Sequence, residues 1–289
     1  LSFYLETTGL EGSADDAKIV IISNTLDKNG IRTRKLFAID DFESEKKMLE
    51  AWCTWVREVN PTIILGHNIY NFDIPYLLKR AYILGTLINI GRDLSPLYLE
   101  GFQSQFRKDQ ITFISYRKPQ CFGRQIIDTW LMAMDHDRIS QKYPNYKLKD
   151  IAKFEKIEAQ SRVYYDASLI RKNWMIPEEM AKIKIYAEND ADEALDLYYI
   201  VCGTKFLITP HIPKGYQNVT LSATGSLCNS LMVRAYNQIN HSIAEASDKE
   251  SYEGSIANGN EGIYKNVFKI DVSSLYPSIM LTYKVQDSV

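Results

Sequence analysis

Cysteine and histidine are scarce in this sequence, with four of each among 289 residues. The cysteines lie far apart, without paired metal-ligand spacing, at Cys53, Cys121, Cys202 and Cys228, and the histidines do not cluster with them. Structural zinc sites and disulfide frameworks both need such pairs. The sequence therefore argues against both kinds of site and indicates a reducing, aqueous compartment.

An excess of charge of one sign is also lacking. Lysine and arginine total 34 and aspartate and glutamate 36, which gives a net charge of -2. Such a chain has no long-range positive field to attract a polyanion. Local basic clusters occur at 107–108, at 117–118 and across Lys147, Lys149 and Lys153. Clusters of this kind are solvated surface more often than phosphate contacts, so any contact with nucleic acid is expected to be local.

Long apolar runs are missing as well. No stretch approaches the roughly 18 apolar residues of a membrane span, and no signal peptide precedes the first predicted strand. We therefore expect a protein that is neither secreted nor bound to a membrane. The hydrophobic content of 45% is enough for one substantial core and part of a second. The chain starts with Leu1 rather than Met, which we interpret as a piece of a longer protein.

The residues that are present predict an α/β protein. Three segments with β signals, 1–8, 18–26 and 33–39, are separated by polar turns and indicate a meander. Further strands and helices then alternate, which is typical of α/β units. We predict later strands at 62–65, 111–116, 124–130 and within 268–280, and helices at 44–60, 74–84, 147–155, 177–206 and 220–238. The Pro- and Gly-containing stretch at 207–216 predicts a boundary between a domain at 1–215 and a second at 216–289.

Three acids stand in segments that would otherwise be structural. Glu6 shares a strand face with Tyr4, because alternate residues of a strand point to the same side. An edge strand with Glu6 in water is the alternative. Asp73 could simply cap the helix that follows it. Asp190 shares a helix face with Tyr186, four residues earlier, although an acid near a helix start also suits the helix dipole.

Taken in order, the segments "FYLETTG", "GHNIYNFDIPYLL" and "YAENDADEAL" resemble the three exonuclease motifs of family B DNA polymerases. Two later segments are similar to that family's linker and first palm motifs, namely "YEGS" at 252–255 and "DVSSLYPSI" at 271–279. The resemblance implies a ribonuclease H-like exonuclease fold, with a mixed β-sheet flanked by helices, over 1–215. It also implies the beginning of a polymerase palm domain over 216–289.

The exonuclease motifs imply a particular chemistry. Hydrolysis of a phosphodiester by two metal ions requires carboxylates that converge on ions roughly 3.5 to 4 Å apart. By the resemblance, Glu6, Asp73 and Asp190 would bind Mg²⁺, and Tyr186 would orient the attacking water. Asn68 and Phe72, in the second motif, would bind the single-stranded 3′ end.

The later motifs imply polymerase residues. Asp271 and the Val272 carbonyl would hold Mg²⁺ for nucleotide addition, and Tyr276 would pack under the incoming sugar. The resemblance places further substrate-binding residues at Tyr252, Gly254, Ser274 and Leu275. The full-length protein would bind primer-template DNA and deoxynucleoside triphosphates, in the cytoplasm or wherever the replicating DNA lies. A processivity partner is not indicated.

Position 4 departs from the family pattern, which requires Asp where this chain has Tyr4. A neutral phenol with a pKa of about 10 is a poor ligand for Mg²⁺. Asp192 cannot replace the missing acid, because a residue two positions along the helix from Asp190 faces away. We therefore predict a fragment of a DNA-directed DNA polymerase with an impaired exonuclease. The alternative is a non-catalytic exonuclease-fold module that binds single-stranded primer ends; a free-standing repair exonuclease is disfavoured by "DVSSLYPSI".

Overall fold

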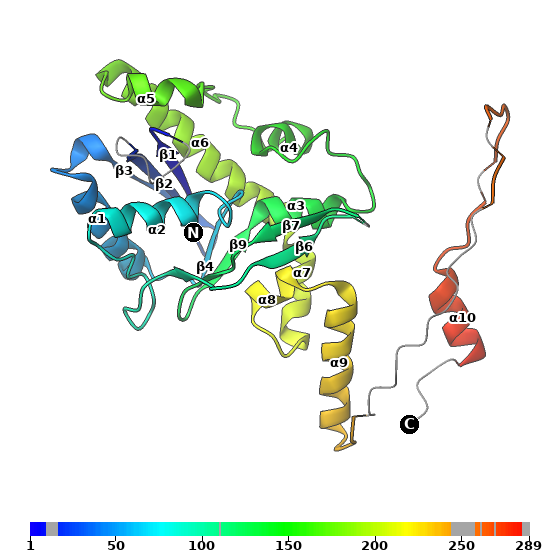
Figure 1. The fold of residues 1–289 in the computed structure, drawn as a ribbon. Coiled ribbons are helices and arrows are strands. Elements are labelled where there is room, and N and C mark those ends of the chain that lie inside the picture. Colours follow the sequence, from blue (N-terminus) through cyan, green and yellow to red (C-terminus); the bar gives the residue numbers. More distant parts are fainter. Residues whose placement is uncertain (10–16, 110, 244–257, 261, 269, 285–289) are drawn as a thin grey trace. The chain divides into compact units, whose positions relative to one another are not determined.

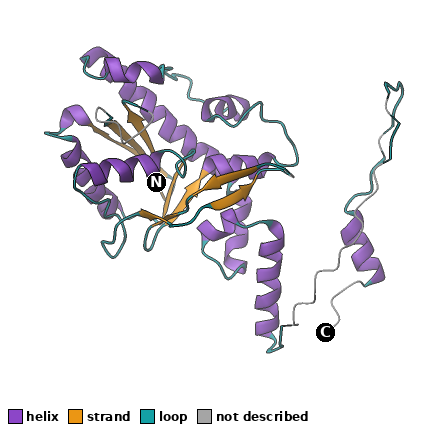
Figure 2. Ribbon diagram, viewed as in Figure 1, coloured by secondary structure: helices purple, strands orange, loops and turns teal. Residues whose placement is uncertain are grey.

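The computed structural model describes residues 1–9, 17–109, 111–243, 258–260, 262–268 and 270–284. These residues form two compact units, Leu1–Arg234 and Ala235–Val289, and each is described by itself. The first unit is an α/β domain with helices on both faces of a sheet (Figure 1, Figure 2). The boundary predicted at 215 stays a prediction.

The central sheet has the strand order β3-β2-β1-β4-β9. The predicted meander is present as three antiparallel strands, β1 (Ser2–Thr7), β2 (Ile19–Lys28) and β3 (Ile31–Ala38). On the other side of β1 the sheet continues with two parallel strands, β4 (Ile63–Gly66) and β9 (Gln125–Asp128). The sheet is therefore mixed, and β1 is its central strand. The alternative of an edge strand with Glu6 in water is wrong.

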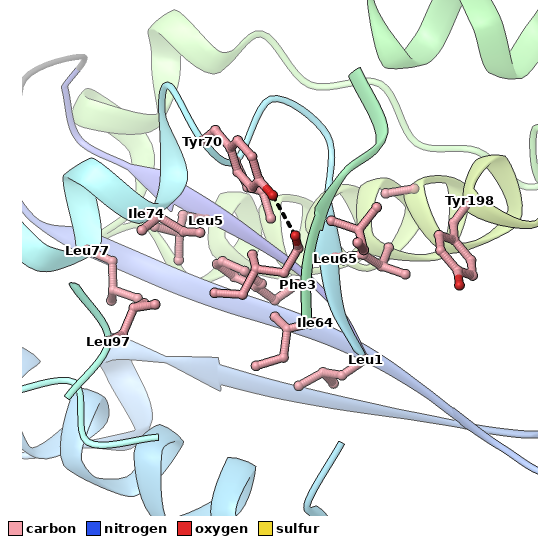
Figure 3. Packing of buried hydrophobic residues seen from close by; sticks show 14 of the residues in the cluster. Leu1, Phe3, Leu5, Ile64, Leu65, Tyr70, Ile74, Leu77, Leu97 and Tyr198 are labelled. Atoms are coloured by element: carbon pink, nitrogen blue, oxygen red, sulfur yellow. Dashed lines mark hydrogen bonds between the residues drawn. The ribbon is translucent and has the colours of Figure 1, made fainter. Parts of the chain in front are cut away.

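One face of the sheet packs against α1 (Glu45–Val59) and α2 (Asp73–Ile83). Figure 3 shows Phe3 and Leu5 of β1, together with Leu1 just before that strand, in one apolar cluster with Ile74 and Leu77 of α2. On the α1 side, the rings of Phe3 and Trp52 lie 5.7 Å apart between centroids. The apolar side of β1 thus anchors both helices, and each large buried side chain contributes roughly 1.5 to 3 kcal/mol.

The opposite face is covered by α6 (Pro177–Val201). Its first turn begins with a proline, which is preorganised for a helix start. The Ser23 hydroxyl of β2 donates a hydrogen bond of 2.7 Å to the Ala187 carbonyl in the middle of this helix. The polar side of β1 therefore faces α6 and not water.

Shorter elements complete the first unit. Two small antiparallel pairs are β5 (Tyr98–Leu99) with β8 (Pro119–Gln120) and β6 (Ser104–Arg107) with β7 (Phe113–Tyr116). The other α-helices that begin within it are α3 (Thr129–Asp137), α4 (Leu148–Glu155), α5 (Ile170–Asn173), α7 (Gly203–Ile208), α8 (Tyr216–Leu221) and α9 (Thr224–Gln238). Single 3₁₀ turns are η1 (Ile39–Asp41), η2 (Ala167–Leu169) and η3 (Thr209–His211). Within the described ranges, no helix is both long enough and apolar enough to cross a bilayer.

The second unit contains α10 (Leu275–Tyr283), which follows Ser274 in the left-handed conformation. The strand predicted within 268–280 is wrong for the described residues, because 270–273 form no strand and the segment then becomes helical. A strand needs a neighbouring strand to satisfy its backbone hydrogen bonds, and none of the described residues provides one here. All described side chains from 258 onward are exposed.

Candidate active site

Strand β1 points Tyr4 and Glu6 toward the face that α6 covers. Glu6 is only 4% exposed, and its Oε1 accepts no hydrogen bond from any described residue. Burial raises the pKa of Glu6 well above its ordinary value, and the charge of Asp190 raises it further. A buried carboxylate oxygen without a donor is available to a cation, so Glu6 belongs to a candidate site.

Asp73 reaches the same region from α2. It is the first residue of that helix, and Phe72, not Asp73, occupies the cap position. Its Oδ1 accepts a 3.0 Å hydrogen bond from the backbone N–H of Leu5, which lies between Tyr4 and Glu6. Burial raises the pKa of Asp73 to about 7. The alternative of a simple helix cap is therefore wrong, because the carboxylate ties α2 to the central strand.

Asp190 and Tyr186 approach from α6. Both lie in the middle of this helix, so Asp190 is too far from its start to serve the helix dipole. Lys149 of α4 donates a 2.5 Å hydrogen bond to the Tyr186 hydroxyl, and its Nζ lies 4.3 Å from the centroid of that ring. The cation thus holds the phenol beside Asp190, whose pKa is raised by burial.

The Tyr4 phenol meets these groups at one place. Burial raises the pKa of Tyr4 well above its ordinary value, and the charges of Asp190, Glu6 and Asp73 raise it further. The ring therefore stays neutral under all ordinary conditions. The three sequence motifs, far apart in the chain, converge on this phenol, and they do so from β1, α2 and α6.

Two charged residues that lie beside these acids were not predicted from the sequence. Arg162, in the segment between α4 and η2, forms an ion pair with Asp190, and its Nη1 lies 2.7 Å from Glu193 Oε1. The side chain of Arg162 is only 3% exposed. Glu193 lies three residues after Asp190 on the same helix. Residues at this spacing share a helix face, so the sequence could have predicted that Glu193 lies beside Asp190. We call Glu6, Asp73, Asp190 and Glu193 the acid cluster.

The second motif is shaped by Asp128, which was also missed. Its Oδ1 accepts a 2.9 Å hydrogen bond from the Asn68 N–H, and its Oδ2 accepts one of 3.0 Å from the Tyr70 N–H. Asn68 adopts the left-handed conformation, with φ of 64°, and the Phe72 ring packs 5.7 Å from that of Tyr76. The predicted contacts of Asn68 and Phe72 with a DNA end stay predictions.

The predicted polymerase residues belong to the second unit. Asp271 and Val272 are exposed and precede α10, while Ser274, Leu275 and Tyr276 lie at its start. Tyr252 and Gly254 lie outside the described residues. The roles of all seven stay predictions.

The acid cluster, as arranged, does not fit two divalent ions. Glu6 offers a free oxygen, but position 4 supplies a phenol, and Asp190 is bound to Arg162. Over the described ranges, no three His, Cys, Asp or Glu side chains are grouped so that they could hold a metal. Hard cations such as Mg²⁺ need several converging oxygen ligands.

Residues 1–151 match the family model described as DNA polymerase family B, exonuclease domain. The chain is 26% identical to the DNA polymerase of Thermococcus litoralis, over 99% of this chain and 17% of that protein. It is 24% identical to that of Desulfurococcus sp. (strain Tok), over 99% of this chain and 36% of that protein. The chain thus spans between about a sixth and about a third of these relatives.

A solved structure has the same fold. It is the family B DNA polymerase of the hyperthermophilic archaeon Pyrobaculum calidifontis, with a TM-score of 0.65 and 18% identity, over 87% of this chain and 30% of that one. The predicted ribonuclease H-like α/β fold and the predicted family are both confirmed. Because the exonuclease match covers 151 of the 289 residues, this chain belongs to the family B DNA polymerases.

Proposed function

We propose that residues 1–215 bind single-stranded 3′ ends of DNA but hydrolyse them poorly, as the impaired exonuclease domain of a DNA-directed DNA polymerase. One observation carries this proposal: the Tyr4 phenol lies among Glu6, Asp73 and Asp190, where the family motif has an acid. A ring with a raised pKa supplies no negative charge to a divalent ion. Loss of one such transition-state contact slows an enzyme by about 100-fold or more.

Support for binding comes from basic and aromatic side chains beside the acid cluster. Lys153 of α4 lies 4.7 Å from the ring centroid of Tyr164, which is 51% exposed. An exposed ring of this kind stacks on a base for roughly 1 to 3 kcal/mol, and neighbouring lysines contact phosphates in a salt-dependent way. The chain has no net positive charge, so binding is expected to be weak and local.

Fluorescence anisotropy with a labelled oligothymidine, in buffer containing Mg²⁺, tests this proposal. We expect salt-sensitive binding and an oligonucleotide that remains intact on a gel. Tyr164→Ala should weaken binding by about 5-fold or more, as expected for one lost stacking contact. Tyr82→Ala removes an even more exposed ring, 80% exposed, from α2 and should have no effect. Absence of binding at high protein concentration, or rapid degradation, would contradict the proposal.

The alternative is a domain that has no hydrolytic activity at all. The pairing of Asp190 with Arg162 favours this alternative, because it removes a second acid from metal binding. A measurement of residual nuclease activity distinguishes the impaired exonuclease from the domain without hydrolytic activity. A slow Mg²⁺-dependent rate that Asp190→Asn abolishes would indicate an impaired enzyme, and a rate unchanged by Asp190→Asn would indicate a binding module.

We further propose that residues 216–289 contribute to polymerase activity in a longer protein. There Asp271 and the Val272 carbonyl would bind Mg²⁺, and the other palm residues would bind primer-template DNA and deoxynucleoside triphosphates. Asp271 is the single palm carboxylate that the motifs identify in this chain. We therefore expect the 289 residues alone to add no nucleotides in a primer-extension assay; template-dependent extension by the pure chain would overturn this expectation.

A further inference from the structure

Arg162 differs from the other buried arginines in what surrounds it. Arg80 pairs with one acid, Glu45, through two hydrogen bonds of 3.0 and 2.6 Å. Arg162 instead contacts two acids, Asp190 and Glu193, and its charge also acts on a third acid, Glu6. A single ion pair accounts for the burial of Arg80. It does not account for the burial of Arg162, whose guanidinium contacts two members of the acid cluster.

Aromatic rings hold this guanidinium in place. The Cζ of Arg162 lies 5.6 Å from the ring centroid of Tyr164 and 5.7 Å from that of Tyr186. Both distances are within the range of a cation–π interaction. Arg162 is thus positioned by two rings and by two carboxylates one turn apart on α6, and its side chain is almost fully enclosed.

We propose that the Arg162 guanidinium occupies the place of a divalent cation in the acid cluster, where it pairs with Asp190 and Glu193, so that these two acids do not recruit metal. This inference rests on the proposed function, because it assumes that the cluster descends from the exonuclease site. It assigns Arg162 as a positioning and charge-compensating residue and explains why the cluster keeps its acids without an acid at position 4.

The physical reason lies in the cost of buried charge. Several carboxylates close together destabilise a fold unless a cation compensates them, and removal of one partner of a buried pair leaves the other uncompensated. Arginine is always charged and offers five donors, so it can bridge two carboxylates. A metal ion that entered the cluster would have to displace Arg162 and leave its guanidinium without a partner. The arginine therefore competes with the metal.

Calorimetric titration with Mn²⁺ alone tests this inference. Wild type should bind no Mn²⁺ at low millimolar concentration, and Tyr4→Asp should bind it only weakly. Tyr4→Asp combined with Arg162→Gln should bind at least about 10-fold more tightly than Tyr4→Asp. The matched control combines Tyr4→Asp with Arg34→Gln. This second change removes an exposed arginine that pairs with Asp192 of α6, so the control should bind Mn²⁺ as Tyr4→Asp alone does.

Equal Mn²⁺ affinity of Tyr4→Asp and of the double variant would overturn the inference. If the double variant fails to fold, Tyr4→Asp still decides, because it restores the acid at position 4 and keeps the arginine: stoichiometric Mn²⁺ binding by Tyr4→Asp would overturn the inference, and weak or absent binding would support it. Failure of the proposed function has a different signature, which is rapid DNA degradation by wild type in Mg²⁺. The two failures are therefore distinguishable.

Discussion

At the scale of single residues, the meaning of Tyr4 depends on its neighbours. On an exposed strand it would be an ordinary tyrosine, but here it lies on the buried face of a central strand, beside Glu6 and opposite α6. Burial and the acids that surround it keep it neutral, and Arg162 supplies a positive charge that pairs with one of these acids, Asp190. Tyr4 and Arg162 thus determine whether the acid cluster can bind a divalent cation.

Asp73 should make stability depend on pH. Its folded pKa of about 7 lies above the ordinary value of 3.8, so the folded state holds the proton more tightly. The stability from this group is complete below the ordinary value and is lost as pH rises through about 7. Asp73→Asn keeps an oxygen for the Leu5 N–H. We expect wild type to lose at least about 1 kcal/mol relative to the variant between about pH 5 and pH 8.

Denaturant unfolding at both pH values measures this difference. Asp109→Asn, which changes an exposed acid whose pKa is lowered by hydrogen bonds, is the matched control and should not reproduce it. A difference between wild type and Asp73→Asn that stays constant with pH would show that Asp73 is not protonated in the folded protein.

At the scale of elements, the loop between β4 and α2 is fixed by its contacts with later parts of the chain. Asp128 accepts hydrogen bonds from the loop backbone. His67 joins it to two other segments, since its Nδ1 lies 3.1 Å from Thr129 Oγ1 and its Nε2 lies 2.9 Å from the Tyr146 carbonyl oxygen. The loop that carries Asn68 and Phe72 is therefore held by α3 and by the residues before α4.

His67 should contribute stability only while it is neutral. Burial lowers its pKa from 6.5 to about 4, so the unfolded chain binds the proton more readily. The stability from this group is present above the ordinary value and is lost as pH falls through about 4. We expect the advantage of wild type over His67→Gln to shrink by about 1 to 2 kcal/mol between about pH 7 and pH 4.5. Urea unfolding measures it, and an advantage that grows on acidification would contradict the account.

At the scale of the whole molecule, the two units differ in how they are stabilised. Residues 1–234 share a large apolar core, whereas the described side chains from 258 onward are all exposed. Exposed side chains contribute little to the free energy of unfolding, because hydrophobic stabilisation scales with buried apolar area. The first unit should therefore be stable without the second.

Truncation after residue 243 should leave thermal unfolding unchanged. The shortened chain keeps every strand that the described residues form and the whole of α9. For a domain of this size, a loss of 1 kcal/mol lowers Tm by roughly 2 to 4 °C, so we expect Tm to change by less than about 2 °C. Calorimetry on both chains measures it. A lower Tm or loss of cooperative unfolding would show that residues beyond 243 stabilise the first unit.

The sequence predicted the elements that have a regular pattern. Alternating residues revealed the β1–β3 meander, and the helical spacing of Trp52 and its neighbours revealed α1. Helix α3 was missed, because its start depends on Asp128, which accepts a hydrogen bond from the Trp130 N–H, and not on a long apolar periodicity. The strand predicted near Asp271 was wrong, since a pattern of apolar residues does not show whether a partner strand exists.

The candidate site could be predicted only in part, for a similar reason. Glu6, Asp73 and Asp190 were found because each belongs to a recognisable motif, and the structure brings them together. Arg162 lies in an irregular segment without periodicity, so its contact with Asp190 depends on the path of the chain between α4 and α6. Long-range contacts of irregular segments are not encoded in local patterns.

The central claim is that an exonuclease fold here lacks a working metal site. A gel time course of Mg²⁺-dependent degradation of single-stranded DNA tests it most directly, with wild type, Asp190→Asn and the Tyr4→Asp/Arg162→Gln double variant. We predict that wild type degrades DNA slowly, at a rate that Asp190→Asn abolishes, and that the double variant is at least about 100-fold faster than wild type. Degradation by wild type at the rate of the double variant would contradict the account.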